Sequence, residues 1–200
     1  MAREIERRPI EIENPPVERF VFNDTRFSIV WLIARLYVGW SWLDAGWEKV
    51  SNPAWTQTGA ALKGFWTGSL AQSTGSHPAI AFDWYRSFIQ YLVDIQAWTW
   101  FAKLIVAGEL IVGVLLIFGA FTGIAAFVGG FLNWNFMMAG SASINPVLFT
   151  LSILLMLAWK NAGYLGLDRW LLPALGTPWK PAIRLRTAER PSPVKAPVEK

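Results

Sequence analysis

Six charged side chains interrupt otherwise apolar stretches of the chain, and they are the residues best suited to chemistry. The bases are Arg35, Lys49 and Lys103, and the acids are Asp44, Glu48 and Glu109. A charge inside hydrocarbon is costly, so such groups usually face the interior of a helix bundle and pair with one another. Paired acids and bases in that setting can hydrogen-bond a carbonyl oxygen and relay protons.

Four apolar segments must position these charges. They cover residues 28–50, 99–121, 123–139 and 145–159, and polar or glycine- and proline-containing stretches separate most of them. About 20 apolar residues cross a hydrocarbon core of about 30 Å as a helix. We therefore predict an all-α polytopic membrane protein built as a bundle of four transmembrane helices.

The sequence around the bundle indicates three regions. Residues 1–25 are predicted as a cytoplasmic arm, 26–170 as the four-helix membrane domain, and 171–200 as a basic, proline-rich cytoplasmic tail. Within the membrane domain, residues 51–98 are predicted as an extracytoplasmic loop. Amphipathic stretches in that loop, at 60–71 and 81–96, predict short helices with an aromatic surface near the membrane interface.

The orientation follows from the distribution of lysine and arginine. Arg19, Arg26, Lys160 and Arg169 flank one side of the predicted spans, whereas the long loop holds only two basic residues. Positively charged residues concentrate on the cytoplasmic side of membrane proteins. We therefore expect a multi-pass protein of a prokaryotic cell membrane with both termini in the cytoplasm.

The depth of each charge predicts its partner. At a rise of about 1.5 Å per residue, Arg35 lies roughly 10 Å and Glu109 roughly 18 Å from the cytoplasmic face, within reach of each other. Lys103 lies at roughly 27 Å, between Asp44 at about 24 Å and Glu48 at about 30 Å. We expect Arg35 to pair with Glu109, and Lys103 to pair with the other two acids.

These polar residues also allow a purely structural interpretation. Ion pairs can pin helices together, and Asn133 and Asn135 of the third span can form interhelical hydrogen bonds. A buried ion pair seldom adds net stability, however, so a functional role for Arg35 and Glu109 is as well supported as a structural one. Both interpretations stay open at this point.

The composition excludes several classes of function. The chain is 54% hydrophobic and 16% charged, and the placement of its basic residues in flanking tails argues against nucleic-acid binding. It has no cysteine and one histidine, His77, which argues against thiol chemistry, cysteine-ligated metals and a bis-histidine haem. We expect no metal and no haem, so redox chemistry would use a diffusible quinone or the cofactor of a partner.

Motifs in three of the spans resemble the DoxX/DoxD family. They are Arg35-x-x-x-Gly39 and Gly46-x-x-Lys49 in the first span, Glu109-Leu-x-x-Gly113 running to Gly119 in the second, and Asn161-Ala-Gly163-Tyr-Leu-Gly166-Leu-Asp168 at the exit of the fourth. The likeness covers about residues 26–173 and implies a four-helix membrane fold. DoxD-like members are implied to be the membrane subunit of thiosulfate:quinone oxidoreductase. The family's polar positions match Arg35, Lys49, Glu109 and Asp168.

The expected function is therefore that of a membrane subunit of a quinone-linked oxidoreductase, with thiosulfate or related sulfur compounds as the leading substrates. The expected catalytic residues, which would bond a quinone carbonyl or relay protons, are Glu109, Arg35 and Lys103. The expected lining of an apolar slot for the quinone head is Trp134, Asn133, Asp44 and Trp100.

The expected partners are membrane lipid and a second protein subunit, with a homo-oligomer as an alternative. Two rival functions use the same polar residues. One is a non-catalytic scaffold that holds a partner complex at the membrane, and the other is a pathway for protons or a small solute.

Overall fold

The computed structural model describes residues 15–73 and 77–177, and within these ranges the chain forms helices and turns without a strand. This confirms the all-α prediction. Near the N-terminus the elements are α1 (Pro16–Glu18), η1 (Arg19–Asn23) and η2 (Thr25–Phe27). The remaining elements are α2 (Ser28–Val50), α3 (Pro53–Thr56), α4 (Ala60–Ala71), α5 (Asp83–Asp94), α6 (Trp98–Phe118), α7 (Thr122–Met138), α8 (Asn145–Leu157), α9 (Trp159–Ala162) and α10 (Asp168–Ala174).

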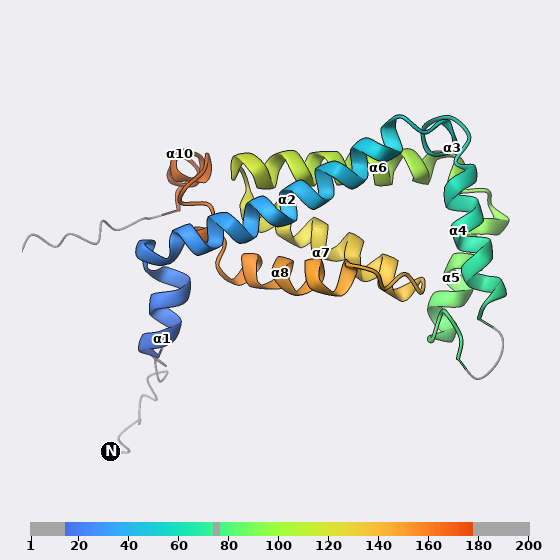
Figure 1. The fold of residues 1–200 in the computed structure, drawn as a ribbon, viewed down its shortest axis with the longest axis horizontal. Helices are drawn as coiled ribbons and strands as arrows, with labels where there is room; N and C mark the ends of the chain where they lie inside the picture. The colour runs from blue at the N-terminus through green and yellow to red at the C-terminus, as the bar shows by residue number, and fades with distance from the viewer. Residues whose placement is uncertain (1–14, 74–76, 178–200) are drawn as a thin grey trace, which may run out of the picture.

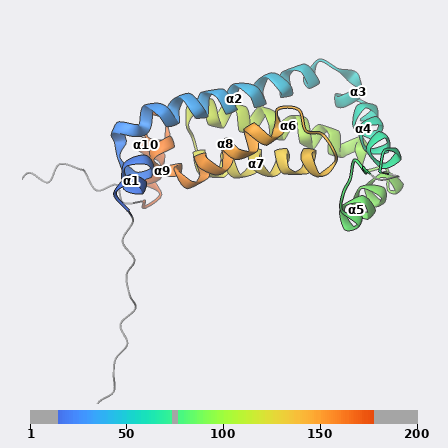
Figure 2. The same ribbon diagram turned by 60° about the horizontal axis from the view of Figure 1, so that its bottom comes forward.

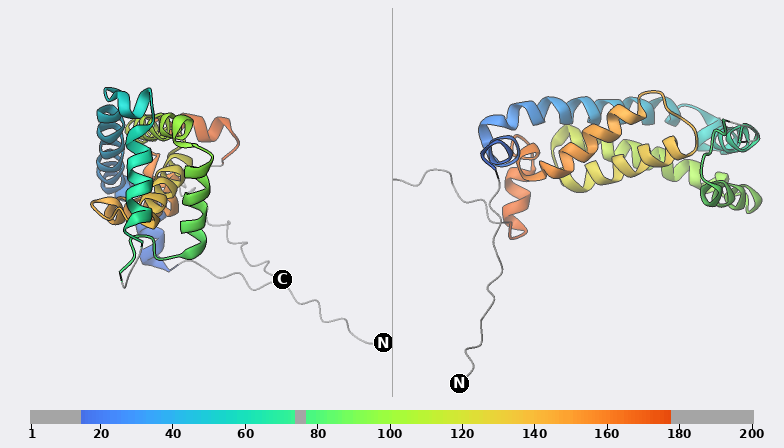
Figure 3. Two further views of the ribbon diagram at one scale, coloured as in Figure 1. Left: turned by 90° about the vertical axis from the view of Figure 1, so that its right-hand side faces the viewer. Right: turned by 90° about the horizontal axis from the view of Figure 1, so that it is seen from below.

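Four of these helices, α2, α6, α7 and α8, run side by side and form an elongated bundle (Figures 1 and 2). The short helices α3, α4 and α5 gather at one end of the bundle, which we call the hairpin end, where α4 and α5 lie across the bundle axis (Figure 3). The elements α1, η1 and α10 lie at the opposite end, which we call the terminal end (Figure 1).

Glycines set the register of α2 against α6. A Cβ added at Gly39 would lie 3.0 Å from Cβ of Leu116, and one added at Gly113 would lie 2.7 Å from the amide nitrogen of Leu43. A Cβ at Gly46 would lie 3.2 Å from the amide nitrogen of Leu110. The missing side chains let two antiparallel backbones approach closely, as small residues do between membrane helices.

The bundle exposes apolar side chains and buries polar ones. The exposed set, which covers all four bundle helices, includes Ile33, Trp40, Trp47, Ile111, Phe118, Phe127, Phe131, Val147 and Leu157. The buried polar set includes Arg35, Glu109, Asn133, Ser152, Asn161 and Asp168. An apolar surface of this extent suits lipid rather than water.

The described helices differ in how well each one alone meets the requirements for crossing a membrane. Among the residues that the structure covers, only α6 is both long and apolar enough, and α8 is apolar but shorter. The 23 residues of α2 have the necessary length, but this helix carries Arg35, Asp44, Glu48 and Lys49. The sequence-based prediction of helices at these positions is confirmed.

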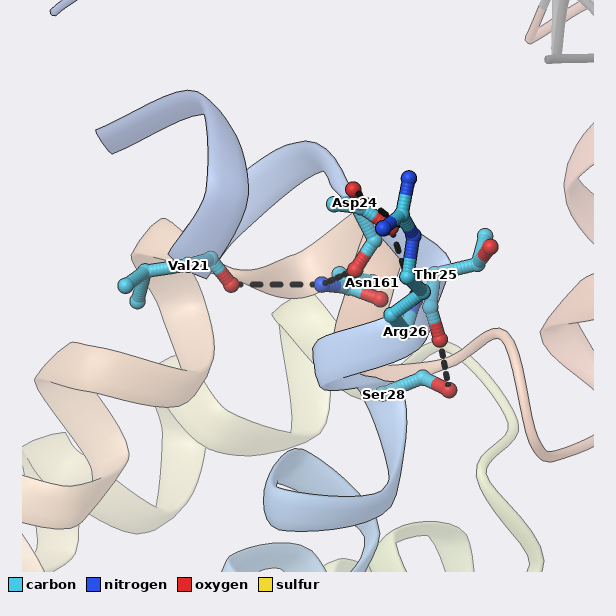
Figure 4. Close-up of polar contacts among 6 residues, drawn as sticks. All are labelled: Val21, Asp24, Thr25, Arg26, Ser28 and Asn161. Atoms are coloured by element: carbon cyan, nitrogen blue, oxygen red, sulfur yellow. Dashed lines mark hydrogen bonds and ion pairs between the residues drawn. The ribbon is translucent and has the colours of Figure 1, made fainter. Parts of the chain in front are cut away.

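At the terminal end, the segment before α2 docks on the exit from α8. The side-chain amide of Asn161 donates hydrogen bonds to the backbone oxygens of Val21, at 3.2 Å, and Asp24, at 2.9 Å (Figure 4). The hydroxyl of Ser28 closes the next turn by donating to the backbone oxygen of Thr25 at 2.6 Å. The described half of the predicted arm thus packs on the bundle, whereas residues 1–14 and 178–200 lie outside the described residues.

Candidate functional site

The most buried acid of the bundle pairs with a lysine near the hairpin end. Nζ of Lys49 on α2 lies 2.9 Å from Oε2 of Glu109 on α6, and the side chains are 19% and 1% exposed, respectively. Nζ also donates to the backbone oxygen of Ala45 at 3.2 Å and lies 5.3 Å from the centroid of the Trp55 ring. The pair therefore joins a buried carboxylate to a lysine whose side chain is partly exposed.

Local sequence explains how this pair forms. Gly46 lets α2 approach α6 at Leu110. Lys49, one turn after Gly46 on α2, then meets Glu109, which directly precedes Leu110 on α6. After α2 ends, the side chain of Asn52 accepts from the amide of Ala54 at 2.9 Å and caps α3. This turn carries the Trp55 ring back to the ammonium.

A second buried charge lies at the terminal end. Nη2 of Arg35 donates to the backbone oxygen of Leu165 at 2.9 Å, although these residues are 130 positions apart in sequence. Gly119 and Gly166 make room for the guanidinium, because a Cβ added at either position would collide with Nη1. The guanidinium is therefore held in a slot between backbone segments.

Asp168 supports this slot from the other side. Its carboxylate accepts from the backbone amides of Phe121, at 2.6 Å, and Thr122, at 2.8 Å, at the start of α7. The carboxylate also stabilises the charge of Arg35 electrostatically. An acid at a helix N-terminus is favourable because free amides and the helix dipole face it. The family-like motif at 161–168 thus builds a clasp between α2, α7 and the chain after α9.

Asn133 lies at the depth of Glu109 on the facing helix. A Cβ added at Gly129 would lie 3.1 Å from Cγ1 of Val112, so these residues of α7 and α6 face each other. Asn133 lies one helical turn from Gly129, and Glu109 lies one turn from Val112, both toward the hairpin end. The two side chains are therefore at the same level. Within the described part of the chain, neither the nitrogen nor the oxygen of the Asn133 amide has a hydrogen-bond partner.

An aromatic cluster covers α7 on the side of α5. Trp134 stacks on Trp84 with ring centroids 6.4 Å apart and on Phe131 with centroids 5.9 Å apart. The hydroxyl of Tyr85 donates to the backbone and side-chain oxygens of Asn135, both at 3.1 Å. Burial raises the pKa of Tyr85 to about 12. Asn135, which we expected to bond between spans, therefore joins α7 to the loop helix α5.

The structure corrects the predicted pairing of charges. Glu109 pairs with Lys49 rather than Arg35, because Arg35 lies at the terminal end and bonds Leu165. Lys103, Asp44 and Glu48 are exposed, and no ion pair within the described ranges includes them. The predicted catalytic set of Glu109, Arg35 and Lys103 is therefore not brought together.

The predicted quinone slot is also divided. Asn133 faces the interior, and Trp134 belongs to the cluster on α5. Asp44 and Trp100 are exposed. Sequence reasoning missed Trp55, Trp42 and Ser152 at or near the Glu109 level. The signal in the sequence that could have located this level is the pair of glycine motifs Gly46-x-x-Lys49 and Glu109-x-x-x-Gly113. Small residues mark the level at which two helices meet.

The described residues contain no group of three or more histidine, aspartate or glutamate side chains placed to hold a metal ion. The Lys49–Glu109 pair offers a hydrogen-bond donor on a partly exposed side chain and a buried carboxylate that can accept a proton. Such a pair can hydrogen-bond a ligand carbonyl through the ammonium and exchange protons through the acid.

Comparison with protein-family models matched residues 30–141, more than half of the chain, to the DoxX family. The match includes α6, α7 and nearly all of α2, and thus both Lys49 and Glu109. No curated protein and no solved structure matched the chain.

Proposed function

The chain belongs to the DoxX family of membrane proteins, and from this premise we propose that it is the membrane subunit of a quinone-linked oxidoreductase. The observation that carries the proposal is the contact of 2.9 Å between Lys49 and Glu109, in which the lysine is partly exposed and the acid is buried. A quinone head needs one donor for its carbonyl and a route for protons, and this pair supplies both.

The reduction of a quinone to a quinol takes up two electrons and two protons. In our proposal the ammonium of Lys49 donates a hydrogen bond to one carbonyl oxygen, and the ring of Trp55 packs against the head group. Glu109 passes one proton to this oxygen as it is reduced and is reprotonated from water, and the other quinone oxygen takes the second proton from water. The electrons come from a second chain that oxidises the substrate, because this chain has no cysteine and one histidine.

The substrate class that we propose for that second chain is thiosulfate or a related sulfur compound. The support is the resemblance to DoxD-like proteins in the motifs at Arg35, Glu109 and 161–168. The oxidation of such a compound by the partner would supply the electron pair, and the quinone in this subunit would accept it.

A face of α2 is suited to hold the partner. Trp40 and Trp47 are 64% and 70% exposed, and the exposed carboxylate of Asp44 lies between them on the same side of the helix. Tryptophan contributes strongly at protein interfaces, and an acid that faces outward from a spanning helix is better placed against a partner than against lipid. We propose this face, rather than a self-association surface, as the subunit contact.

We further propose that α2, α6, α7 and α8 each cross the membrane, with the terminal end in the cytoplasm. The apolar exposed surface of all four helices supports this arrangement, as does the position of Arg19, Arg26, Lys160 and Arg169 at the terminal end. A reporter fused at His77, in the loop between α4 and α5, should report an extracytoplasmic position. A cytoplasmic signal there would reverse the orientation.

The test of quinone binding is to extract and quantify the quinone that co-purifies with the protein. Lys49→Met should retain at least about tenfold less quinone than the wild type, because the charged donor is lost while the side chain keeps its length. Glu48→Gln, at the exposed neighbouring position, is the matched control and should retain the wild-type amount. Equal retention in Lys49→Met, or no quinone in the wild type, would favour the scaffold function.

A further inference from the structure

Three side chains near the centre of the bundle are buried with their polar atoms unbonded. They are the indole N–H of Trp42 on α2, the amide of Asn133 on α7 and the hydroxyl of Ser152 on α8. No group in residues 15–73 or 77–177 bonds to these atoms. An unbonded buried polar group costs about 1–3 kcal/mol, and in native proteins an ordered water usually bonds to it.

These three side chains are neighbours. A Cβ added at Gly129 would lie 2.8 Å from Nε1 of Trp42, and a Cβ added at Gly130 would lie 3.3 Å from Cβ of Ser152. Asn133 follows on the same face of α7, one helical turn of about 5.4 Å nearer the hairpin end. Two adjacent glycines thus let the Trp42 indole and the Ser152 side chain lie close against α7, so that unbonded polar groups from three helices gather in one region of the bundle.

The cluster is continuous with the surface at the hairpin end. Asn133 lies level with Glu109, and Glu109 contacts Lys49, whose side chain is partly exposed. Polar groups therefore follow one another from the surface to the middle of the bundle. We use the name polar well for the group of buried polar side chains formed by Glu109, Asn133, Ser152 and the Trp42 indole.

Toward the terminal end the polar well stops at an apolar layer. Val38, Leu116 and Leu155 are completely buried, as is Ala126 on α7. Leu116 lies against Gly39, one turn of α2 away from Trp42 toward the terminal end, and Leu155 follows Ser152 by one turn on α8. This layer separates the polar well from Arg35 and the clasp at the terminal end.

We propose that the polar well holds water and connects Glu109 to the hairpin side alone, with the apolar layer closing it toward the terminal end. Its use as the proton supply of Glu109 rests on the proposed quinone function, whereas the hydration of the well does not. A well open on one side delivers protons to a quinone without allowing them to cross the membrane. The rival function of a continuous proton pathway requires both sides to be open.

The absence of cysteine from the chain makes hydration directly measurable. Ser152→Cys places a thiol in the polar well, and Leu155→Cys places one in the apolar layer, one turn away on the same buried face of α8. Silver ion, added to membranes that carry the full chain, reaches a thiol only through water. Thiols that it has not bound are then counted with a maleimide after denaturation.

Ser152→Cys should react with silver ion at least about tenfold faster than Leu155→Cys, because an apolar setting suppresses the reactive thiolate. The faster reaction should occur from the side on which Gln72→Cys, at the exposed end of α4, reacts with an impermeant reagent. Equal rates for the two buried cysteines, or a faster reaction from the opposite side, would overturn the proposal. Neither result requires a quinone, so failure here is distinct from failure of the proposed function.

Proton flux into liposomes tests the apolar layer without cysteine. The wild type should be proton-tight, and Leu116→Asn should raise the flux at least about tenfold by wetting a hydrophobic constriction. Val114→Asn places the same amide on the exposed face of α6 and should leave the flux at the wild-type value. A conducting wild type, or equal fluxes in the two variants, would show that the layer is not the barrier.

Discussion

The ammonium of Lys49 lies 2.9 Å from the carboxylate of Glu109, and this contact joins α2 to α6. The lysine side chain is partly exposed, whereas the acid is buried. The aliphatic part of Lys49 packs along the bundle while its charge reaches both the acid and the ring of Trp55. A charge pair in this position can serve chemistry because one member contacts the surroundings and the other does not.

Removal of the lysine should leave a buried carboxylate without its counter-charge. We expect Lys49→Met to lower the free energy of unfolding by about 3 kcal/mol, the low end for breaking a buried pair, because Lys49 is partly exposed. The double variant Lys49→Met/Glu109→Leu should lose less than Lys49→Met alone. Denaturant unfolding of the purified protein in detergent measures these losses and that of Glu109→Leu alone. A loss in the double variant equal to the sum of the two single losses would show that the two groups are not coupled.

Gly119 should not tolerate a side chain. Its φ is +65°, in the left-handed region, and a Cβ would collide with the guanidinium of Arg35. We expect Gly119→Ala to cost at least about 3 kcal/mol, since backbone strain and the collision add. Gly64→Ala, in α4 where nothing lies within 4 Å of an added Cβ, should be neutral or stabilising. Thermal unfolding distinguishes the two, and similar melting temperatures would contradict the Arg35 slot.

Asp168 should stabilise the fold by capping the N-terminus of α7. Its carboxylate accepts from both Phe121 and Thr122, and an amide has only one oxygen for the two donors. We expect Asp168→Asn to lower stability by about 1–2 kcal/mol, the usual cost of weakening a charged helix cap. Asp83→Asn, at an exposed acid of α5, is the control and should change stability by less than about 0.5 kcal/mol.

The hydroxyl of Tyr85 should stabilise the fold up to unusually high pH. Its pKa is raised to about 12 in the folded protein against about 10 in an unfolded chain, so the folded state holds the proton more tightly. The stability that this gives is complete below pH 10 and is lost as the pH rises toward 12. Tyr85→Phe should lose less stability than the wild type over that interval, as followed by circular dichroism. If the wild type and Tyr85→Phe lose the same stability as the pH rises, the result would contradict the burial of this hydroxyl.

Much of the fold follows from patterns that can be read along the chain. The long apolar segments predict α2, α6, α7 and α8, and the amphipathic stretch at 60–71 coincides with α4. These features depend on residues close together in sequence, and a helix needs no distant contact to be recognised. Three of the four polar positions that the family resemblance singled out, Arg35, Glu109 and Asp168, are buried in the structure.

The pairing of charges could not be predicted in the same way. Depth counting assumed that α2 and α6 end in one plane, which places residue 40 opposite Glu109. The contact of Gly46 with Leu110 shows that α2 is displaced along α6 by about two turns, on the order of 10 Å, from the position that depth counting assumed. This register depends on glycine packing between segments that are far apart in sequence. For the same reason, the bond from Arg35 to Leu165 had no local indication.

The most direct test of the account is the rate of quinone reduction in membranes that carry the assembled complex. Glu109→Gln keeps the shape of the side chain but removes proton transfer, and we predict a rate at least about tenfold below that of the wild type at matched protein level. Glu48→Gln makes the same chemical change at an exposed position and should keep the wild-type rate. Full activity in Glu109→Gln would contradict a role in proton transfer and leave the Lys49–Glu109 pair a structural contact.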